Sequence, residues 1–468
     1  MLSIGYELFS RMNLAVDRTL GRRIFVLAAP VVLAMVSQTA INVVDHILVG
    51  RLPSSESIPG QAAIGISLIL YWAIGGFLSA ISVGTQALTA RRFGEQSASR
   101  AGQVMLNSIT VAAISSAVFS LACWVLVPKI FPFFHKDPHV VELGVPYLQW
   151  RMLGLFSMVT TISYKSWFDG LGKTHVHMIS AIAMNVINFF LNIALIFGKW
   201  GFPKWGVTGS AIASMISSYI GLALMIIWSL LREYRVPYHN YALANLSGKQ
   251  QWEIARLSLP SGIATMFVMS GFGLFFKIVG ILDVGAHQGS LFAAATQNII
   301  MILMVFFTGS MAYGTATATL VGQSMGAKDH ALAERYGWEA VKLGVYFASV
   351  LGVLVVIFPE TVLHAFTKDA PVIDVARPIL RICGALLPFV LSAIVLTQAL
   401  FGAGNTTFVM IVEFALHFSC LVPLAYVCGV RLHWGVLGVW CGAFAYILLL
   451  CSIMAWKFAE GKWKDIRI

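Results

Sequence analysis

The chain has 468 residues, of which 58% are hydrophobic and only 11% are charged. A soluble domain usually carries about 25% charged residues, and the mean hydropathy here is +0.82. These values exclude an ordinary soluble protein and leave no polar region large enough for a nucleic-acid-binding module. The net charge of +11 is therefore assigned to loops that face the anionic headgroups of a lipid bilayer.

Apolar blocks long enough to cross a bilayer, which takes about 20 residues, recur along the whole chain. We predict twelve spans, at 24–50, 62–87, 104–127, 147–167, 174–198, 206–231, 256–281, 290–320, 338–358, 379–402, 407–428 and 434–458. The sequence thus predicts an all-α polytopic membrane protein with twelve transmembrane helices.

The charged residues outside the spans indicate the orientation. Residues 1–23 are basic and amphipathic, and we expect them to lie at the membrane surface. Most of the 31 Lys and Arg residues fall on the same side as this segment. By the positive-inside rule, both termini, including a tail at 459–468, are predicted to be cytoplasmic.

A polar stripe containing one carboxylate crosses the first span. Gln38, Asn42 and Asp45 are spaced by four and three residues, so they share one helix face. A charged aspartate at the bilayer centre costs roughly 2.5–3.5 kcal/mol on insertion scales. We therefore expect Asp45 to face the protein interior or water, as a site for H⁺ or Na⁺ or as an aspartate hydrogen-bonded to a neighbouring helix. His46 lies about 100° around the helix and is interpreted as a packing residue.

The fifth span offers partners for this acid. Asn185, Asn188 and Asn192 follow spacings of three and four. Three amides on one face suit ligation of Na⁺ or hydrogen bonds to a carboxyl group, and equally suit bonds between helices.

A few polar residues mark the second half. Glu413 and His417 share a face of the eleventh span, and Lys277 lies in the seventh. A Glu413–Lys277 pair would lower the cost of burying both charges, and Glu413 is alternatively a second coupling site. Gln297, in the eighth span, is a further candidate for a substrate cavity.

The two halves of the chain repeat one another. GLGKT at 170–174 corresponds to GAGNT at 402–406, and Gly94 to Gly326, both at an offset of 232 residues. GVTG at 206–209 corresponds to GVLG at 435–438, at an offset of 229. The first and seventh spans correspond at an offset of 230, with these matches: Leu27, Pro30, Ala34, Val49 and Gly50 with Leu257, Pro260, Ala264, Val279 and Gly280.

Each half holds six predicted spans, so both enter the membrane in the same direction and form a parallel repeat. We predict two six-helix lobes, at 24–231 and 256–458, joined by a cytoplasmic linker at 232–255. At the offset of 230, Phe275 takes the place of Asp45. The first-span acid therefore belongs to the N-terminal lobe alone.

Catalytic and metal-binding motifs are missing from the sequence. The six cysteines show no C-x-x-C spacing, and no nucleophile, base and orienting acid stand at a recognisable spacing. We therefore expect a protein that is not an enzyme and needs no cofactor.

The residues resemble a known family. The pattern of Pro30, Gln38, Asn42, Asp45 and Gly50 is similar to the first helix of MATE transporters, the multidrug and toxic compound extrusion family. GTQALTARRFGE at 84–95 and TATLVGQSMGAKD at 317–329 resemble that family's paired loops, and GVTGSAIAS at 206–214 resembles the start of its sixth helix.

This resemblance implies an antiporter with two six-helix lobes that exports organic cations and other drug-like molecules in exchange for H⁺ or Na⁺. It implies an ion site at Asp45 and Asn188, with Asn192 where some members have a second aspartate and Ser214 where the family often has threonine. A glutamate in the seventh helix and an aspartate in the tenth, found in one branch, are missing here. We expect a monomer in a bacterial inner membrane.

The main alternative is a flippase for lipids or lipid-linked glycans, which can share this two-lobed architecture. A flippase for acidic headgroups should have a basic cavity. The predicted spans are nearly free of Lys and Arg, which favours drug export.

Overall fold

The computed structural model describes the backbone of residues 16–134, 137–285 and 290–468, and the side chains within these ranges except at 40, 42, 43, 46, 54, 55, 58 and 285. All regular structure in these ranges is helical. The prediction of an all-α protein is therefore confirmed.

The helices follow the order of the predicted spans. Those of the first half are α2 (Arg18–Gly50), α3 (Ser54–Ser79), α4 (Ile81–Gly94), α5 (Ala98–Phe134), α6 (Pro138–Gly170), α7 (Thr174–Phe197) and α8 (Gly206–Leu230). The linker contains α9 (Arg232–Tyr238) and η1 (Leu243–Asn245). Those of the second half are α10 (Gly248–Gly285), α11 (Leu291–Gly326), α12 (His330–Ile357), α13 (Pro359–His364), α14 (Ala370–Gly402), α15 (Thr406–Leu416), η2 (His417–Leu421), α16 (Val422–Tyr426), η3 (Val427–Arg431), α17 (Gly435–Glu460) and η4 (Lys462–Asp465).

Eleven helices among the described residues are long and apolar enough to cross a membrane. They account for eleven of the predicted spans. The remaining span, predicted at 147–167, lies within α6, which packs against both α5 and α8. This helix is more polar because it carries Arg151 and Lys165. It also begins earlier than predicted, at Pro138, so Arg151 lies well inside the helix.

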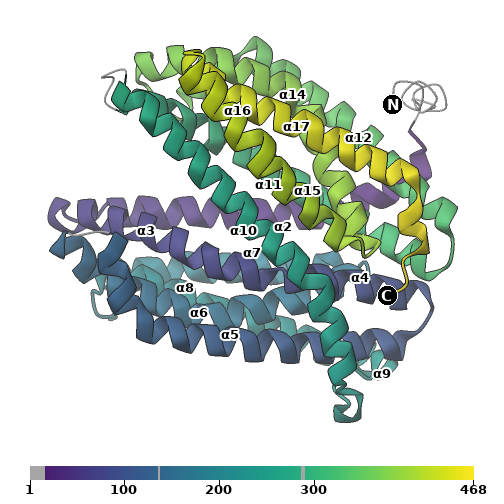
Figure 1. Cartoon of the computed structure of the whole chain (residues 1–468). Coiled ribbons are helices and arrows are strands. Elements are labelled where there is room, and N and C mark those ends of the chain that lie inside the picture. Colours follow the sequence, from purple (N-terminus) through teal and green to yellow (C-terminus); the bar gives the residue numbers. More distant parts are fainter. Residues whose placement is uncertain (1–15, 135–136, 286–289) are drawn as a thin grey trace.

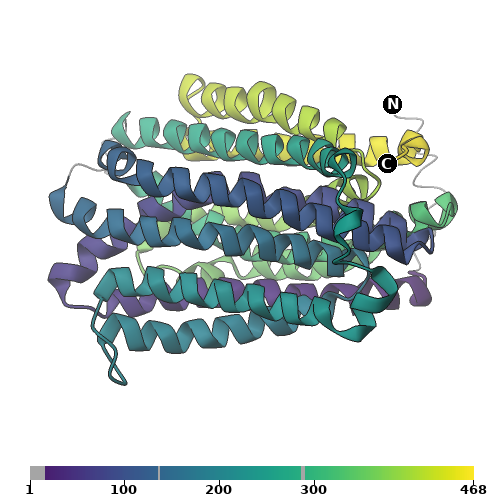
Figure 2. The same ribbon diagram turned by 90° about the horizontal axis from the view of Figure 1, so that it is seen from below.

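The helices form two lobes that meet at one end and diverge at the other (Figure 1). One lobe contains α3 to α8, and the other contains α10 to α17. The start of α2 and the C-terminus lie at the end where the lobes meet, which we call the closed end, in both Figure 1 and Figure 2. The predicted two-lobed architecture is confirmed.

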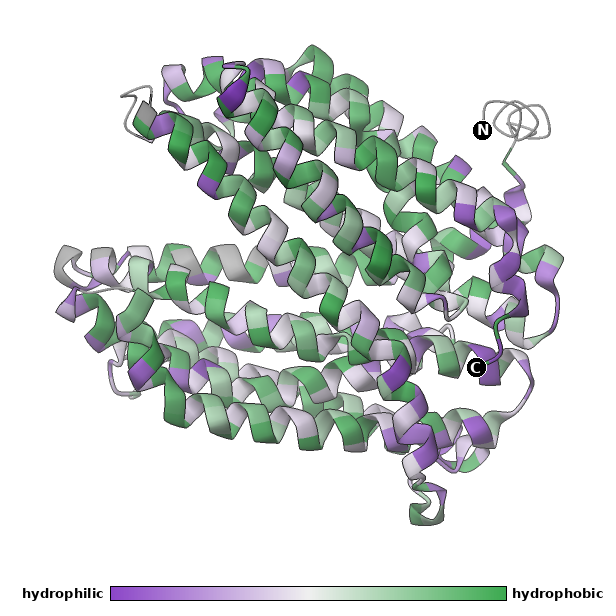
Figure 3. Cartoon of the chain, in the orientation of Figure 1, coloured by the Kyte–Doolittle hydropathy of each residue, from purple (hydrophilic) through white to green (hydrophobic). Residues whose placement is uncertain are grey.

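The distribution of hydropathy fits a membrane protein. Hydrophobic residues run along the helices, whereas hydrophilic residues gather at the closed end and in the loops (Figure 3). Large apolar side chains such as Ile114, Leu121 and Val125 on α5 are more than half exposed. Such extensive apolar surface is characteristic of a surface that contacts lipid.

The first helix of each half begins in the core of the other half. Leu20 and Ile24 of α2 are buried in a cluster with residues of α11, α12 and α14. Ile254 and Leu257 of α10 are buried in a cluster with residues of α3, α5 and α6. Ile24 and Ile254 correspond at the repeat offset of 230. These two helices therefore couple the lobes at the closed end.

Two repeat-related glycines allow the lobes to touch there. A Cβ added to Gly94, at the end of α4, would lie 1.9 Å from the main-chain oxygen of Gln323 on α11. A Cβ added to Gly326, at the end of α11, would lie 2.0 Å from the main-chain oxygen of Arg91 on α4. Both distances are too short for any side chain, so each glycine permits a backbone contact between lobes.

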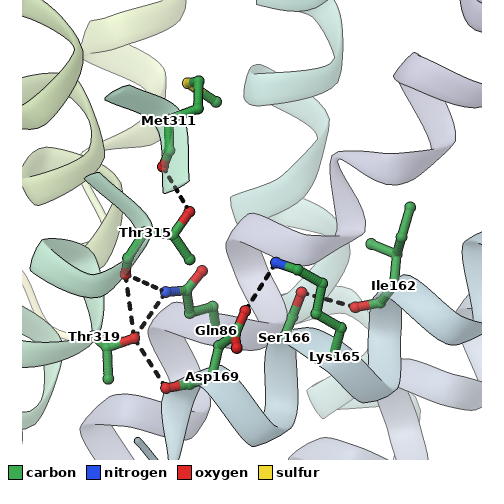
Figure 4. A network of polar contacts seen from close by, with 8 residues as sticks. All are labelled: Gln86, Ile162, Lys165, Ser166, Asp169, Met311, Thr315 and Thr319. Atoms are coloured by element: carbon green, nitrogen blue, oxygen red, sulfur yellow. Dashed lines mark hydrogen bonds and ion pairs between the residues drawn. The ribbon is translucent and has the colours of Figure 1, made fainter. Parts of the chain in front are cut away.

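A buried polar network crosses the same junction (Figure 4). The amide nitrogen of Gln86 on α4 donates to the main-chain oxygen of Thr315 at 2.8 Å and to the hydroxyl of Thr319 at 2.9 Å. The Thr319 hydroxyl donates to the main-chain oxygen of Asp169 on α6 at 2.9 Å. The Asp169 carboxylate is paired with Lys165 at 2.8 Å. Because these groups are buried, their hydrogen bonds stabilise the closed end.

Candidate ion-coupling site

Asp45 lies where α2, α7 and α8 come together. Its Oδ1 accepts a hydrogen bond from Asn192 Nδ2 on α7 at 2.6 Å. Its Oδ2 accepts a longer bond from Ser214 Oγ on α8 at 3.4 Å. Asn192 is fully buried and Ser214 is nearly so. The carboxylate thus faces the interior of the N-terminal lobe, as its position in the polar stripe predicts.

The amides of α7 extend this cluster. Asn192 Nδ2 also donates to Asn188 Oδ1 at 2.9 Å. Asn188 Nδ2 in turn donates to Ser217 Oγ at 3.1 Å and to Ser214 Oγ at 3.4 Å. The structure therefore brings Asp45, Asn188, Asn192 and Ser214 into one hydrogen-bonded group.

One acceptor in this group is left over. Asn192 Oδ1 is buried and has no hydrogen-bond partner among the described residues. Buried polar atoms normally have a partner. The unused oxygen therefore gives the site a place to accept one more hydrogen bond.

The other predicted site residues of the first and fifth spans do not belong to this hydrogen-bonded group. Asn185 Nδ2 donates to Ser37 Oγ on α2 at 2.9 Å, so it also joins α7 to α2. Gln38 is half-buried, and none of the hydrogen bonds of the described residues links it to Asp45. The side chains of Asn42 and His46 lie outside the described part of the chain.

Arg151 is a neighbour of Asp45 that sequence reasoning missed. Its guanidinium lies 4.7 Å from the centre of the Tyr71 ring, and its charge attracts the Asp45 carboxylate. The span predicted at 147–167 puts Arg151 near its start, where a long basic side chain could reach water. The true start of α6 at Pro138 moves it inward. Its distance in sequence from Asp45 gave no sign of this proximity.

The candidates of the second half are arranged differently from the prediction. Glu413 is buried, and its Oε2 accepts a hydrogen bond from the Tyr446 hydroxyl at 2.7 Å. The predicted pair with Lys277 is not formed, because Lys277 is exposed on α10. Gln297 is exposed on α11.

Groups of three or more His, Cys, Asp or Glu side chains able to hold a metal ion do not occur in the described part of the chain. Asp45 and Glu413 each accept hydrogen bonds from uncharged side chains, and Asp45 also lies near the charge of Arg151. A carboxylate in such surroundings can take up a proton or contact a small monovalent cation.

Comparison with known proteins agrees with this geometry. The fold and the buried carboxylate between helices define an integral membrane protein of transporter type. A family model described as MatE matches residues 30–194 and 260–427, one match in each half. The chain therefore belongs to the MatE family, the MATE transporters.

Its relatives are similar along nearly their whole length. The chain is 26% identical over 442 residues to a "Probable multidrug resistance protein NorM" of Thermotoga maritima, covering 94% of this chain and 92% of the relative. It is 24% identical over 425 residues to a protein of the same description from Bacillus subtilis, covering 89% and 90%.

Solved structures share the fold. A multidrug resistance MATE family transporter in an outward-facing conformation aligns with a TM-score of 0.85 at 20% identity, covering 95% of this chain and 97% of the other. The eukaryotic MATE transporter AtDTX14 aligns with a TM-score of 0.83 at 16% identity, covering 96% and 97%.

Proposed function

We propose that this chain is a proton-driven antiporter that exports organic cations and other drug-like molecules, with Asp45 as the group that binds the coupling proton. The observation that carries the proposal is the Asp45 cluster between α2, α7 and α8. The class of substrate is supported by the description of the relatives as probable multidrug resistance proteins.

The donor set favours H⁺ over Na⁺ as the coupling ion. Both amides nearest to the carboxylate turn N–H groups towards their neighbours, Asn192 towards Asp45 and Asn188 towards Ser217. The Asp45 carboxylate, the Ser214 hydroxyl and Asn192 Oδ1, which has no partner among the described residues, are then the oxygen atoms left for a cation. A sodium ion needs several oxygen ligands, whereas a proton needs one.

Protonation changes the hydrogen bonds that Asp45 can make. The ionised carboxylate only accepts, and it receives the N–H of Asn192. Once a proton adds to a carboxylate oxygen, that O–H becomes a donor and needs an acceptor. Asn192 Oδ1, which has no partner among the described residues, is suited to this role after the amide turns over. The proton thereby alters how α2 is held against α7.

Helix α2 can carry this change to the other lobe. Its far half is bonded to α7 and α8 through Asp45, whereas Leu20 and Ile24 are buried in the core of the second half. Pro30 lies between these two regions. Proline has no N–H and removes one helical hydrogen bond, so it provides a point where the helix can bend.

The arrangement of the lobes supports an outward-open state. If the termini are cytoplasmic, as the distribution of basic residues indicates, the closed end faces the cytoplasm. The lobes then diverge on the outer side (Figure 1). Protons would enter from outside, and rocking of the lobes about the closed end would alternate the access.

The test uses proteoliposomes and a fluorescent monovalent organic cation, with an imposed pH gradient or an imposed Na⁺ gradient. We expect the pH gradient to drive exchange in the wild type. Asp45→Asn, which keeps the shape of the side chain, should reduce it to the level of protein-free liposomes. Asp374→Asn, at an exposed carboxylate on α14, serves as the matched control.

Undiminished pH-driven exchange by a folded Asp45→Asn protein would disprove this mechanism. The same liposomes loaded with fluorescent lipid distinguish the flippase alternative. Transfer of lipid between leaflets without transport of the dye would favour that alternative.

A further inference from the structure

A second buried polar cluster lies in the other lobe, on α15, η2 and α17. The Tyr446 hydroxyl donates to Glu413 Oε2 at 2.7 Å. His417 Nδ1 lies 2.8 Å from the main-chain oxygen of Glu413 and 3.4 Å from its Oε2. His417 is fully buried, and Glu413 is 9% exposed. Two titratable groups are thus in contact inside a membrane-embedded lobe.

The imidazole of His417 has a free acceptor. Because Nδ1 lies at hydrogen-bond distance from a carbonyl oxygen, it carries the hydrogen, and Nε2 is then the unprotonated nitrogen of the neutral ring. Nε2 is buried and has no partner among the described residues. Addition of one proton there would create an imidazolium beside the Glu413 carboxylate. Alternatively, the carboxylate itself can take the proton.

The charged and titratable groups around the cluster leave Glu413 without a fixed counter-cation. From α17 it meets Tyr446, and from η2 it meets His417, with Cys420 close to Tyr446. Helix α10 presents Gly271 and Phe272 to the His417 ring, and its Lys277 is exposed. Charged groups of α14 are not among the described partners of Glu413. A buried carboxylate without a fixed cation avoids the cost of burying its charge by taking up a proton.

The backbone around His417 is specialised. The residues from His417 to Leu421 form the first of two π-helical turns in this span, the second being η3, and such turns often occur at functional sites. A Cβ added to Gly271 would lie 2.4 Å from His417 Cδ2. The glycine therefore leaves room for the imidazole between α10 and α17.

The internal repeat relates this cluster to the first one. His417 corresponds to Asn185 at the offset of 232, and Tyr446 corresponds to Ser217 at the offset of 229. Ser217 is hydrogen-bonded to Asn188 of the Asp45 group, and Asn185, one turn along α7 and outside that group, is hydrogen-bonded to Ser37 on α2. Phe275 replaces the acid of the first helix, and Glu413 supplies an acid from the fifth helix of its own half instead. Each lobe thus has a carboxylate that accepts hydrogen bonds from polar side chains of its fifth or sixth helix.

We propose that Glu413, His417 and Tyr446 form a second proton-binding site, so that the transporter exchanges two protons, one per lobe, for each monovalent organic cation. This inference rests on the proposed function. One proton exchanged for one monovalent cation moves no net charge, whereas two protons move one. The second site therefore makes the exchange respond to membrane potential.

The experiment measures the steady-state gradient of a fluorescent monovalent cation in proteoliposomes under a potential set with K⁺ and valinomycin, at equal pH on both sides. We expect the wild type to build a concentration ratio of about fortyfold for each 100 mV. Glu413→Gln should build none. Under a pH gradient alone, the wild type should build a concentration ratio of about hundredfold for each pH unit. Glu413→Gln should build a ratio of about tenfold.

Controls keep the result interpretable. Lys277→Gln removes an exposed charge from the adjacent α10 and should behave as the wild type. Tyr446→Phe keeps the ring and removes the hydroxyl that holds Glu413, so it should shift the pH dependence of the potential-driven exchange. If Glu413→Gln fails to fold, the wild-type potential response alone decides, because exchange that ignores the potential overturns the two-proton stoichiometry.

An unchanged potential response in folded Glu413→Gln would overturn the assignment of the second site. Failure of the proposed function looks different, because the wild type would then show no pH-driven exchange at all.

Discussion

Asn192 Nδ2 donates to Asp45 Oδ1 across 2.6 Å, and this bond joins the fifth helix of the N-terminal lobe to the first. The same amide leaves its own oxygen unpartnered among the described residues. The pair therefore has one arrangement suited to an ionised aspartate, and a second becomes available when the aspartate carries a proton.

Asn192→Asp tests why this chain has an amide at that position. The change would place two carboxylates in direct contact, and such a pair cannot be doubly ionised without a cation between them. We expect a Na⁺ gradient to drive dye exchange in the variant and not in the wild type. Asn192→Ser, which adds no charge, is the control. Dye exchange that stays insensitive to Na⁺ in Asn192→Asp would contradict this interpretation.

Gly94→Ala tests the contact between the lobes. Its new Cβ would lie 1.9 Å from the oxygen of Gln323, so α4 and α11 must separate. We expect the closed end to open, as measured by spin-label distances across the junction, and transport to fall. Gly309→Ala, on the same α11 but with no described atom within 4 Å of the new Cβ, should leave both unchanged. Wild-type distances in Gly94→Ala would refute the role of this glycine.

Gln86→Leu tests the polar network of Figure 4. The change removes two buried hydrogen bonds, to the main-chain oxygen of Thr315 and to the hydroxyl of Thr319. We expect the closed end to lose about 1–3 kcal/mol of stability, read as a lower thermal unfolding temperature. Thr315→Val is a suitable control, because the Thr315 hydroxyl bonds only within its own helix, to Met311. Equal unfolding temperatures for Gln86→Leu and the wild type would rule out the network as a stabilising element.

The start of α2 should be sensitive to acid. The main-chain N–H groups of Leu20 and Thr19, followed by the charge of Arg335 on α12, hold the pKa of Asp17 below its ordinary value of 3.8. A lowered pKa in the folded state means that the stabilisation is present above the ordinary value and is lost as the pH falls through the folded pKa. We therefore expect the protection of the amides at residues 18–22 against hydrogen exchange, relative to the intrinsic rate at each pH, to fall only below about pH 4.

Asp17→Asn provides the comparison for this pH effect. Asparagine can still cap the helix but cannot pair with Arg335. The protection of these amides in Asp17→Asn should be lower at neutral pH and should not fall further in acid. An acid response of the same size in Asp17→Asn would show that another group is responsible.

Features that depend on residues close together along the chain could be predicted from the sequence, whereas features that depend on how helices rotate against one another could not. The spans and the polar stripe follow from the hydropathy and the helical period of adjacent residues, so Asp45, Asn188 and Asn192 could be placed on inward faces. The contact between them needed only two helices to meet along those faces. The pair of Glu413 with Lys277 required a particular rotation of α10 relative to α15, which no local pattern specifies, and there the prediction was wrong.

The sequence by itself determined the membrane class, the helices, the parallel repeat and the N-terminal position of the first acid, because each depends on composition or on spacing along the chain. Only the tertiary structure decided which side chains meet. It brought Arg151 close enough for its charge to attract the Asp45 carboxylate. It also brought the Tyr446 hydroxyl into hydrogen-bond contact with Glu413. It also placed the first helix of each half in the core of the other. These relationships depend on helix rotation and crossing, which are set by the packing of the whole molecule.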